Sequence, residues 1–244
     1  MRWFALCVLV LITTFDLPIE RVAAQEKKLA TKISSPFKDV VWTMKKQPDS
    51  SKFGTPVIHD IFKRGKVQYG KHLGEDYWID AEVPVLACAD GYISLNTEFT
   101  GTLERPGWGG LIVQAVWLKY GKTEKEKVAF YIIYGHLDGR DTTLKPGDFV
   151  QHGQRIGKVA KSKSAQMGYW DEPSQLHLQF MLDPLGKYQR GKIPAGYDSF
   201  YKDGKLTPFD PPYRLLDHIA PSEVFDAKDS VAHLIKEEAN PKRR

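Results

Sequence analysis

Short apolar runs, separated by glycine, proline and aspartate, fill the chain from residue 56 to residue 182. Runs of about four to eight residues that are rich in Val, Ile, Tyr and Phe are typical of β-strands. The clearest are TPVIHDIF, KVQYG, VPVLACADGYISL, GGLIVQAVWL, KVAFYIIYGHL and LHLQFML. Asp90-Gly91, between two such runs, predicts a hairpin turn. Because no long amphipathic helix precedes about residue 213, the sequence predicts a mainly β protein, with a compact antiparallel β-sheet core and short C-terminal helices.

The N-terminal segment has the layout of a secretory signal peptide. Arg2 precedes an apolar run from Trp3 to Phe15, and a small-residue end at Ala24 is the expected cleavage point. The run is too short for a stop-transfer helix, so we expect no stable membrane insertion after cleavage, with an uncleaved anchor as the alternative. The segment predicts an exported protein, located in a periplasm, in a cell wall or outside the cell.

Composition divides the rest of the chain into three parts. Residues 25–55 are rich in Lys and Ser, and we expect a poorly packed lead-in. Residues 56–185 hold the β-rich runs and are predicted to form one domain. Residues 186–244 are predicted to be an irregular C-terminal extension with one or two short helices, one of them N-capped by Ser222 after Pro221.

The cysteines exclude a disulfide framework. Removal of residues 1–24 would take away Cys7 and leave Cys88 as the sole cysteine. A packed core must therefore stabilise the exported protein. Cys88 lies in the apolar run PVLACADG, which favours a buried and unreactive thiol.

The charge is modestly basic. The removed segment holds two basic and two acidic residues, so the mature chain keeps the formal net charge of +5. Such a charge suits an anionic partner such as a cell-wall polymer or a membrane surface. Scattered lysines without a recognition motif argue against nucleic acid as a partner.

Two segments carry isolated groups suited to chemistry. In KHLGEDYW, His72 and Asp76 are four residues apart, and Gly74 favours an extended or bulged segment that turns both side chains to one side. A surface hydrogen-bonded pair is the alternative. In FYIIYGHL, strand alternation places His136 on the same face as Ile132 and Tyr134. His136 is then either a buried core histidine or an acid–base group at the wall of a cleft.

A third segment, SQLHLQFML, predicts a strand with an apolar and a polar face. The apolar face holds Leu176, Leu178, Phe180 and Leu182, and the other face holds Gln175, His177, Gln179 and Met181. The polar face indicates a wet groove, and a solvent-exposed outer face is the alternative.

Together, the three segments offer two histidines and a carboxylate as metal ligands, plus one further histidine. Such a set leaves a fourth position open on a tetrahedral zinc ion, as in catalytic sites. Zinc there would lower the pKa of a bound water to about 7 and polarise a carbonyl. The lack of a cysteine pair argues against a closed structural site.

At these residues the sequence resembles the lysostaphin-type, or LytM-like, zinc endopeptidases of peptidoglycan. The family motifs stand in order as HLGED, VPVLACADGYISL, YGHL and QLH, with a glycine-punctuated turn, LKPGDFVQHGQRIGKV, before the last. The resemblance covers roughly residues 65–183. It implies a compact β-sheet core and an exported enzyme in which a zinc-bound water attacks peptide bonds of peptidoglycan stems or cross-links.

The resemblance also implies the role of each site residue. His72, Asp76 and His177 would ligate zinc, and His136 would be one of two catalytic histidines that do not ligate it. The second catalytic histidine belongs at position 175, where this sequence has Gln175.

A glutamine amide donates a hydrogen bond but takes up no proton near pH 7. The absence of an imidazole at position 175 would lower the rate about 10²–10³-fold if that imidazole stabilises the oxyanion, or about 10²–10⁴-fold if it is the general base. The alternative function is therefore a catalytically weak or inactive zinc-binding module that binds cell wall or regulates a wall hydrolase. Trp108, Tyr169 and Trp170 either line the substrate groove or are ordinary hydrophobic plugs.

Overall fold

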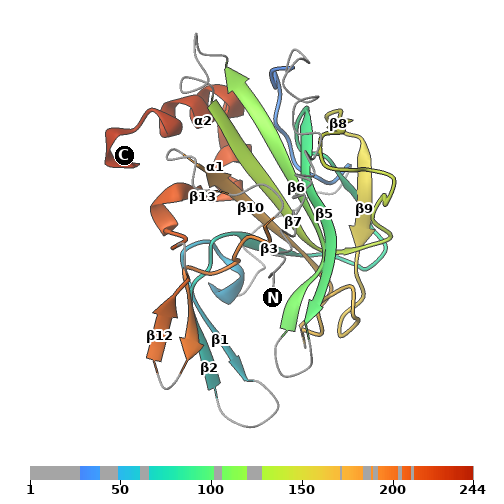
Figure 1. The fold of residues 1–244 in the computed structure, drawn as a ribbon, viewed down its shortest axis with the longest axis vertical. Helices are drawn as coiled ribbons and strands as arrows, with labels where there is room; N and C mark the ends of the chain where they lie inside the picture. The colour runs from blue at the N-terminus through green and yellow to red at the C-terminus, as the bar shows by residue number, and fades with distance from the viewer. Residues whose placement is uncertain are drawn as a thin grey trace, which may run out of the picture.

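The computed structural model describes residues 28–38, 49–60, 66–101, 106–119, 128–170, 172–183, 188, 192–202, 205–209 and 212–243 (Figure 1). The predicted signal peptide and Cys7 lie outside the described residues. None of the helices in the described part of the chain is both long and apolar enough to span a membrane.

The centre of the fold is a nine-stranded sheet in which all pairs are antiparallel. Its main path runs in the order β13-β10-β7-β6-β5-β8, while β3 pairs with β10, and β9 pairs with both β4 and β7. The strands are β3 (Glu75–Trp78), β4 (Pro84–Leu86), β5 (Gly91–Gly101), β6 (Pro106–Lys119), β7 (Val128–Asp138), β8 (Phe149–Val150), β9 (Arg155–Val159), β10 (Gln175–Leu182) and β13 (His218–Ile219). The prediction of a mainly antiparallel β fold is confirmed.

Smaller elements surround this sheet. Two hairpins, β1 (Pro56–Asp60) with β2 (Lys66–Lys71) and β11 (Ser199–Lys202) with β12 (Lys205–Pro208), lie side by side at one end of the molecule (Figure 1). Two helices, α1 (Pro221–Asp226) and α2 (Ser230–Glu238), lie at the other end near β10. The described residues also form three short 3-10 helices: η3 (Asp49–Ser51), η5 (Leu215–Asp217) and η6 (Pro241–Arg243).

The two faces of β10 behave as predicted. Leu176, Leu178, Phe180 and Leu182 point into the main apolar core, whereas Met181 belongs to a second cluster on the opposite face with Trp108 and Ile133. All residues of β10 are buried, including Gln175, His177 and Gln179. Because the strand is covered on both faces, its polar face is not a solvent-exposed outer face.

The predicted hairpin at Asp90-Gly91 is wrong. β4 pairs with β9, whereas β5 pairs with β6 and β8, so Asp90 joins strands that have different partners. Its carboxylate instead accepts a hydrogen bond from the backbone N–H of His152 at 2.8 Å.

The lead-in is better packed than the sequence predicts. Ala30, Ile33 and Phe37 are buried in the main core, and Ile33 forms a β-bridge with Ala89. The segment has few apolar residues, but these three all pack in the main core. For residues 28–38, the prediction of poor packing is therefore wrong.

The C-terminal part adds to the same sheet and core. β13 pairs with β10, and Ile219, Val224 and Leu234 are buried in the main core. Helix α1 begins with Pro221 as its first residue and Ala220 as its N-cap, so Ser222 is not the cap. Ser222 instead donates from its hydroxyl and its backbone N–H to the buried carboxylate of Glu75.

Candidate metal centre

Three predicted site residues come together in one buried cluster. His72 follows β2, while Asp76 in β3 and His177 in β10 are partners in an antiparallel pair. Residues directly opposite in such a pair carry their side chains on the same face of the sheet. Each of the three offers one ligand atom, and these atoms all lie within 4.8 Å of one another.

The distances between these atoms fit a tetrahedral zinc ion. Nδ1 of His177 lies 2.9 Å from Oδ1 of Asp76 and 3.0 Å from Nε2 of His72. Nε2 of His72 lies 3.5 Å from Oδ1 of Asp76. Zinc bonds of about 2.0–2.1 Å at tetrahedral angles hold neighbouring ligand atoms roughly 3.3 Å apart. Two imidazoles and one carboxylate are also ligands that zinc accepts, so the donor set fits the ion in both chemistry and spacing.

Two glycines allow the close approach of the segments that build the cluster. A Cβ atom on Gly74, between His72 and Asp76, would lie 2.5 Å from the carbonyl oxygen of Leu178 and 2.6 Å from Nε2 of His177. A Cβ atom on Gly135 would lie 2.5 Å from the ring of Trp108. Side chains at either position would therefore push the backbone or the rings away from the cluster.

A β-bulge turns His136 toward the cluster. Tyr134 pairs with Ile112 and Leu137 pairs with Gly110, so two residues of β7 stand opposite one residue of β6. His136 has a φ of 61°, which is uncommon for any residue except glycine.

The bulge also changes the predicted faces. Tyr134 and Leu137 both lie in the main core, whereas the ring centroid of His136 lies 6.3 Å from that of His177 and 6.4 Å from that of Trp108. The predicted shared face of Tyr134 and His136 is wrong, because simple alternation ends at the bulge.

The electrostatics of the site favour an ionised carboxylate beside a neutral histidine. Burial alone would raise the pKa of Asp76, but the charge of His72 and the hydrogen bond from His177 outweigh burial and lower it. Burial lowers the pKa of His136 to about 4, and the charge of Asp76 only partly opposes this. His136 is therefore a neutral imidazole at neutral pH, and its Nδ1 has no hydrogen-bond partner among the described residues.

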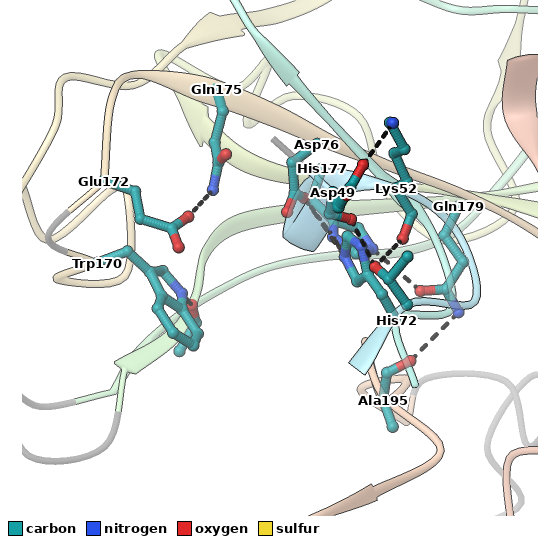
Figure 2. Close-up of polar contacts among 12 residues, drawn as sticks. Asp49, Lys52, His72, Asp76, Trp170, Glu172, Gln175, His177, Gln179 and Ala195 are labelled. Carbon is teal, nitrogen blue, oxygen red and sulfur yellow. Dashed lines mark hydrogen bonds and ion pairs between the residues drawn. The ribbon is translucent and has the colours of Figure 1, made fainter. Parts of the chain in front are cut away.

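Gln175 lies on the same strand face as His177, and its side-chain amide contacts an acidic residue. Its Nε2 donates to Oε2 of Glu172 at 2.8 Å, and its Oε1 has no partner in the described part of the chain. Figure 2 shows this pair on one side of the cluster formed by His72, Asp76 and His177. Glu172 therefore contacts a predicted site residue, a contact that the sequence motifs did not indicate.

Aromatic rings enclose the cluster. The ring of Trp108 packs edge-on against His177 with a centroid distance of 4.8 Å, and Tyr197 stacks on His72 at 5.6 Å. Trp108 also donates from Nε1 to the carbonyl of Pro194. Trp170 is buried in a separate small cluster and donates to the carbonyl of Gly107. Trp108 thus contacts the candidate ligand His177, whereas Trp170 packs with Ala160 and Met167.

The sequence also gave no sign of a buried hydrogen-bonded chain behind His177. Nε2 of His177 contacts Oε1 of Gln179 at 3.2 Å, and Nε2 of Gln179 contacts Nε2 of His218 at 3.0 Å. His218 lies in β13, 39 residues from Gln179, and no sequence motif connects the two residues. Only the pairing of β13 with β10 brings it behind the cluster.

A comparison with protein-family profiles identifies one family. The profile of Peptidase family M23 matches residues 70–190, a range that contains all three candidate ligands. No curated protein matched the sequence.

Similar solved structures include three peptidases. Lysostaphin from Staphylococcus simulans is 24% identical, with a TM-score of 0.31, and the match covers 55% of this chain and 43% of that one. A zinc-containing peptidase from Vibrio cholerae is 17% identical over 64% of this chain and 37% of that one, with a TM-score of 0.40. A putative glycyl-glycine endopeptidase lytM from Ruminococcus gnavus is 17% identical over 85% of this chain and 61% of that one, with a TM-score of 0.38. This chain thus spans less than half of the length of lysostaphin.

Proposed function

Because the chain belongs to peptidase family M23, the lysostaphin-type endopeptidases, we propose that it is an exported zinc endopeptidase that hydrolyses peptide bonds in peptidoglycan. Export is proposed from the signal-peptide layout of residues 1–24. Peptidoglycan peptide is proposed as the substrate from the family resemblance, and the formal net charge of +5 suits an anionic wall polymer.

The observation that carries the proposal is the buried cluster of His72, Asp76 and His177. Its three ligand atoms are separated by 2.9 to 3.5 Å and match the spacing around zinc. A module of the same fold that no longer binds metal would not be expected to keep all three groups together. When bound, zinc would supply a Lewis acid that polarises the scissile carbonyl and makes a water molecule more acidic.

The other residues of the site would handle the proton and the substrate. His136 is neutral at neutral pH and donates a hydrogen bond to the backbone of Trp108, while its Nδ1 has no partner among the described residues. The proton therefore belongs to Nε2, and the lone pair on Nδ1 would accept a hydrogen bond from the attacking water. Trp108 packs against His177 and excludes water from that side of the ligand. Gln175 adds an amide that donates but takes up no proton.

A second function, a weakly active or inactive wall-binding or regulatory module, is favoured by one observation. The amide nitrogen of Gln175 donates to the carboxylate of Glu172 at 2.8 Å, and the amide oxygen accepts a hydrogen bond but takes up no proton near pH 7. The group at this position therefore offers no acid–base chemistry, although the metal ligands are complete.

Metal analysis tests the site. We expect about one zinc per chain in the purified protein and its loss in His177→Ala, because that change removes one of three ligands. Protein that is free of metal and does not take up zinc when zinc is added would refute the proposed site.

Digestion of purified peptidoglycan separates the two functions. An endopeptidase releases soluble fragments with new amino termini, and His136→Ala lowers this release about 10²–10⁴-fold, as expected for loss of an acid–base group. A zinc-loaded protein that binds peptidoglycan and releases no fragments would establish the binding module instead. Mass analysis of the fragments identifies the bond that is cut.

A further inference from the structure

The hydrogen-bonded chain behind His177 is buried along its whole length. Gln179 is fully buried, and His177 and His218 are each at most 3% exposed. Gln179 contacts His177 through Oε1 and contacts both His218 and the carbonyl of Ala195 through Nε2. Figure 2 shows Gln179 between His177 and Ala195, on the other side of the cluster from Gln175.

Two backbone carbonyls set the direction of the hydrogen bonds that link His177, Gln179 and His218. A carbonyl only accepts, so Nε2 of Gln179 must face Ala195, at 3.2 Å, and Oε1 must face His177. The second carbonyl, that of Arg214, lies 2.9 Å from Nδ1 of His218, which must therefore carry a proton. Nε2 of a neutral His218 is then an acceptor for the second N–H of Gln179, at 3.0 Å.

These directions place a proton on Nε2 of His177. Because Oε1 of Gln179 only accepts, Nε2 of His177 carries the proton and donates it at 3.2 Å. Nδ1 is then the nitrogen left to bind a metal ion, and it faces Asp76 and His72. Without metal, the acceptor-only carboxylate of Asp76, at 2.9 Å, holds a proton on Nδ1, and a bound zinc ion would take the place of that proton. A metal ligand must present a lone pair.

We propose that Gln179 and His218 are positioning residues that hold His177 in the tautomer and orientation needed to bind zinc through Nδ1. The inference rests on the zinc site of the proposed function. Gln179 touches the ligand directly, and His218 acts through Gln179. Loss of such an outer contact to a ligating histidine costs about 10–100-fold in metal affinity.

Zinc affinity, measured by competition with a chromophoric chelator, tests the role of Gln179. We expect Gln179→Met to weaken zinc binding by about 10–100-fold. The matched control is Gln114→Met, because Gln114 is an equally buried amide that bonds to the carbonyl of Ala89 and to the hydroxyl of Tyr134, away from the cluster. The control loses comparable hydrogen bonds and should keep its zinc affinity within about twofold. The zinc affinity of His218→Phe should lie between those of the other two variants, because Gln179 keeps its hydrogen bond to the carbonyl of Ala195.

The tautomer of the ligating ring is read from nitrogen-resolved NMR spectra of His177 in the zinc-loaded, unmodified protein, because without metal the carboxylate of Asp76 also holds a proton on Nδ1. A proton on Nε2 of the neutral ring and none on Nδ1 supports the proposal, and this readout needs no variant that folds poorly. A neutral ring protonated on Nδ1 would overturn it, as would unchanged zinc affinity in Gln179→Met. If the unmodified protein binds no zinc at all, the proposed metal site fails, whereas normal zinc binding in Gln179→Met defeats only the positioning role.

Discussion

Replacing Gln175 with histidine tests how an amide affects a complete metal site. Gln175 is 1% exposed, its Nε2 is held by Glu172 at 2.8 Å, and its Oε1 has no partner among the described residues. In Gln175→His, one ring N–H can replace the amide N–H on Glu172. The second ring nitrogen then takes the place of the unpartnered oxygen and, unlike that oxygen, exchanges a proton near neutral pH.

The expected gain follows from the role that the imidazole takes up. If it donates to the developing oxyanion, hydrolysis of peptidoglycan rises by about 10²–10³-fold, which corresponds to about 2.7–4 kcal/mol. If it acts as a general base, the gain reaches about 10²–10⁴-fold. Zinc content stays at that of the unmodified protein, because the substitution changes none of the three candidate ligands.

Two variants isolate the cause of the gain. Gln175→Leu occupies the same buried place without a hydrogen-bonding group and should not raise hydrolysis. Adding Glu172→Gln to Gln175→His should reduce the gain, because a carboxylate orients and charges a paired imidazole better than an amide does. The assay is release of soluble fragments from purified peptidoglycan at equal zinc content. Equal or slower hydrolysis by zinc-loaded Gln175→His would refute the reasoning and show that the glutamine serves a chemistry of its own.

Three further predictions follow from the same geometry. Gly74→Ala should lower both zinc affinity and, by about 1–3 kcal/mol, the free energy of unfolding, because its Cβ would lie 2.5 Å from a backbone oxygen; Gly157→Ala, whose nearest neighbour would be at 3.5 Å, is the control in chelator competition and urea unfolding. Removal of zinc by a chelator should lower the Tm of the unmodified protein and leave the Tm of His177→Ala unchanged. If the free zinc concentration had been about 1,000 times the Kd, the free energy of unfolding should fall by about 4.1 kcal/mol. Burial raises the pKa of Cys88 from its ordinary 9.0 to about 12, so the thiol should resist alkylation in the folded protein. As pH rises from 9.0 toward 12, the unfolded chain ionises while the folded thiol does not, and stability should fall by up to about 1.4 kcal/mol per pH unit more than in Cys88→Ala.

Several features were predictable because they depend on neighbouring residues alone. The alternation along residues 175–182 correctly separated the core face, with Leu176 and Phe180, from the face of His177. The buried state of Cys88 followed from its apolar neighbours and is confirmed. The convergence of the three candidate ligands was predicted through the family resemblance, because spacing alone favoured a surface hydrogen-bonded pair for His72 and Asp76.

Other features depended on contacts between distant segments. The lead-in carries only a few apolar residues, and its burial depends on where Ile33 and Phe37 meet the sheet. Ser222 suited an N-cap by its residue type, but the buried carboxylate of Glu75 takes its hydroxyl instead. In each case, local chemistry allowed two partners and the fold selected one.

By itself, the sequence determined the β-rich architecture and the kinds of ligand available, because strand periodicity and side-chain chemistry are properties of short segments. The tertiary structure alone decided the direction of His136, since its bulge exists only in the pairing of β7 with β6. It also decided the partner of Gln179 behind His177: Gln179 and His218 are 39 residues apart and meet only because β13 pairs with β10. Contacts across such a separation depend on which strands pair, and no local pattern encodes that choice.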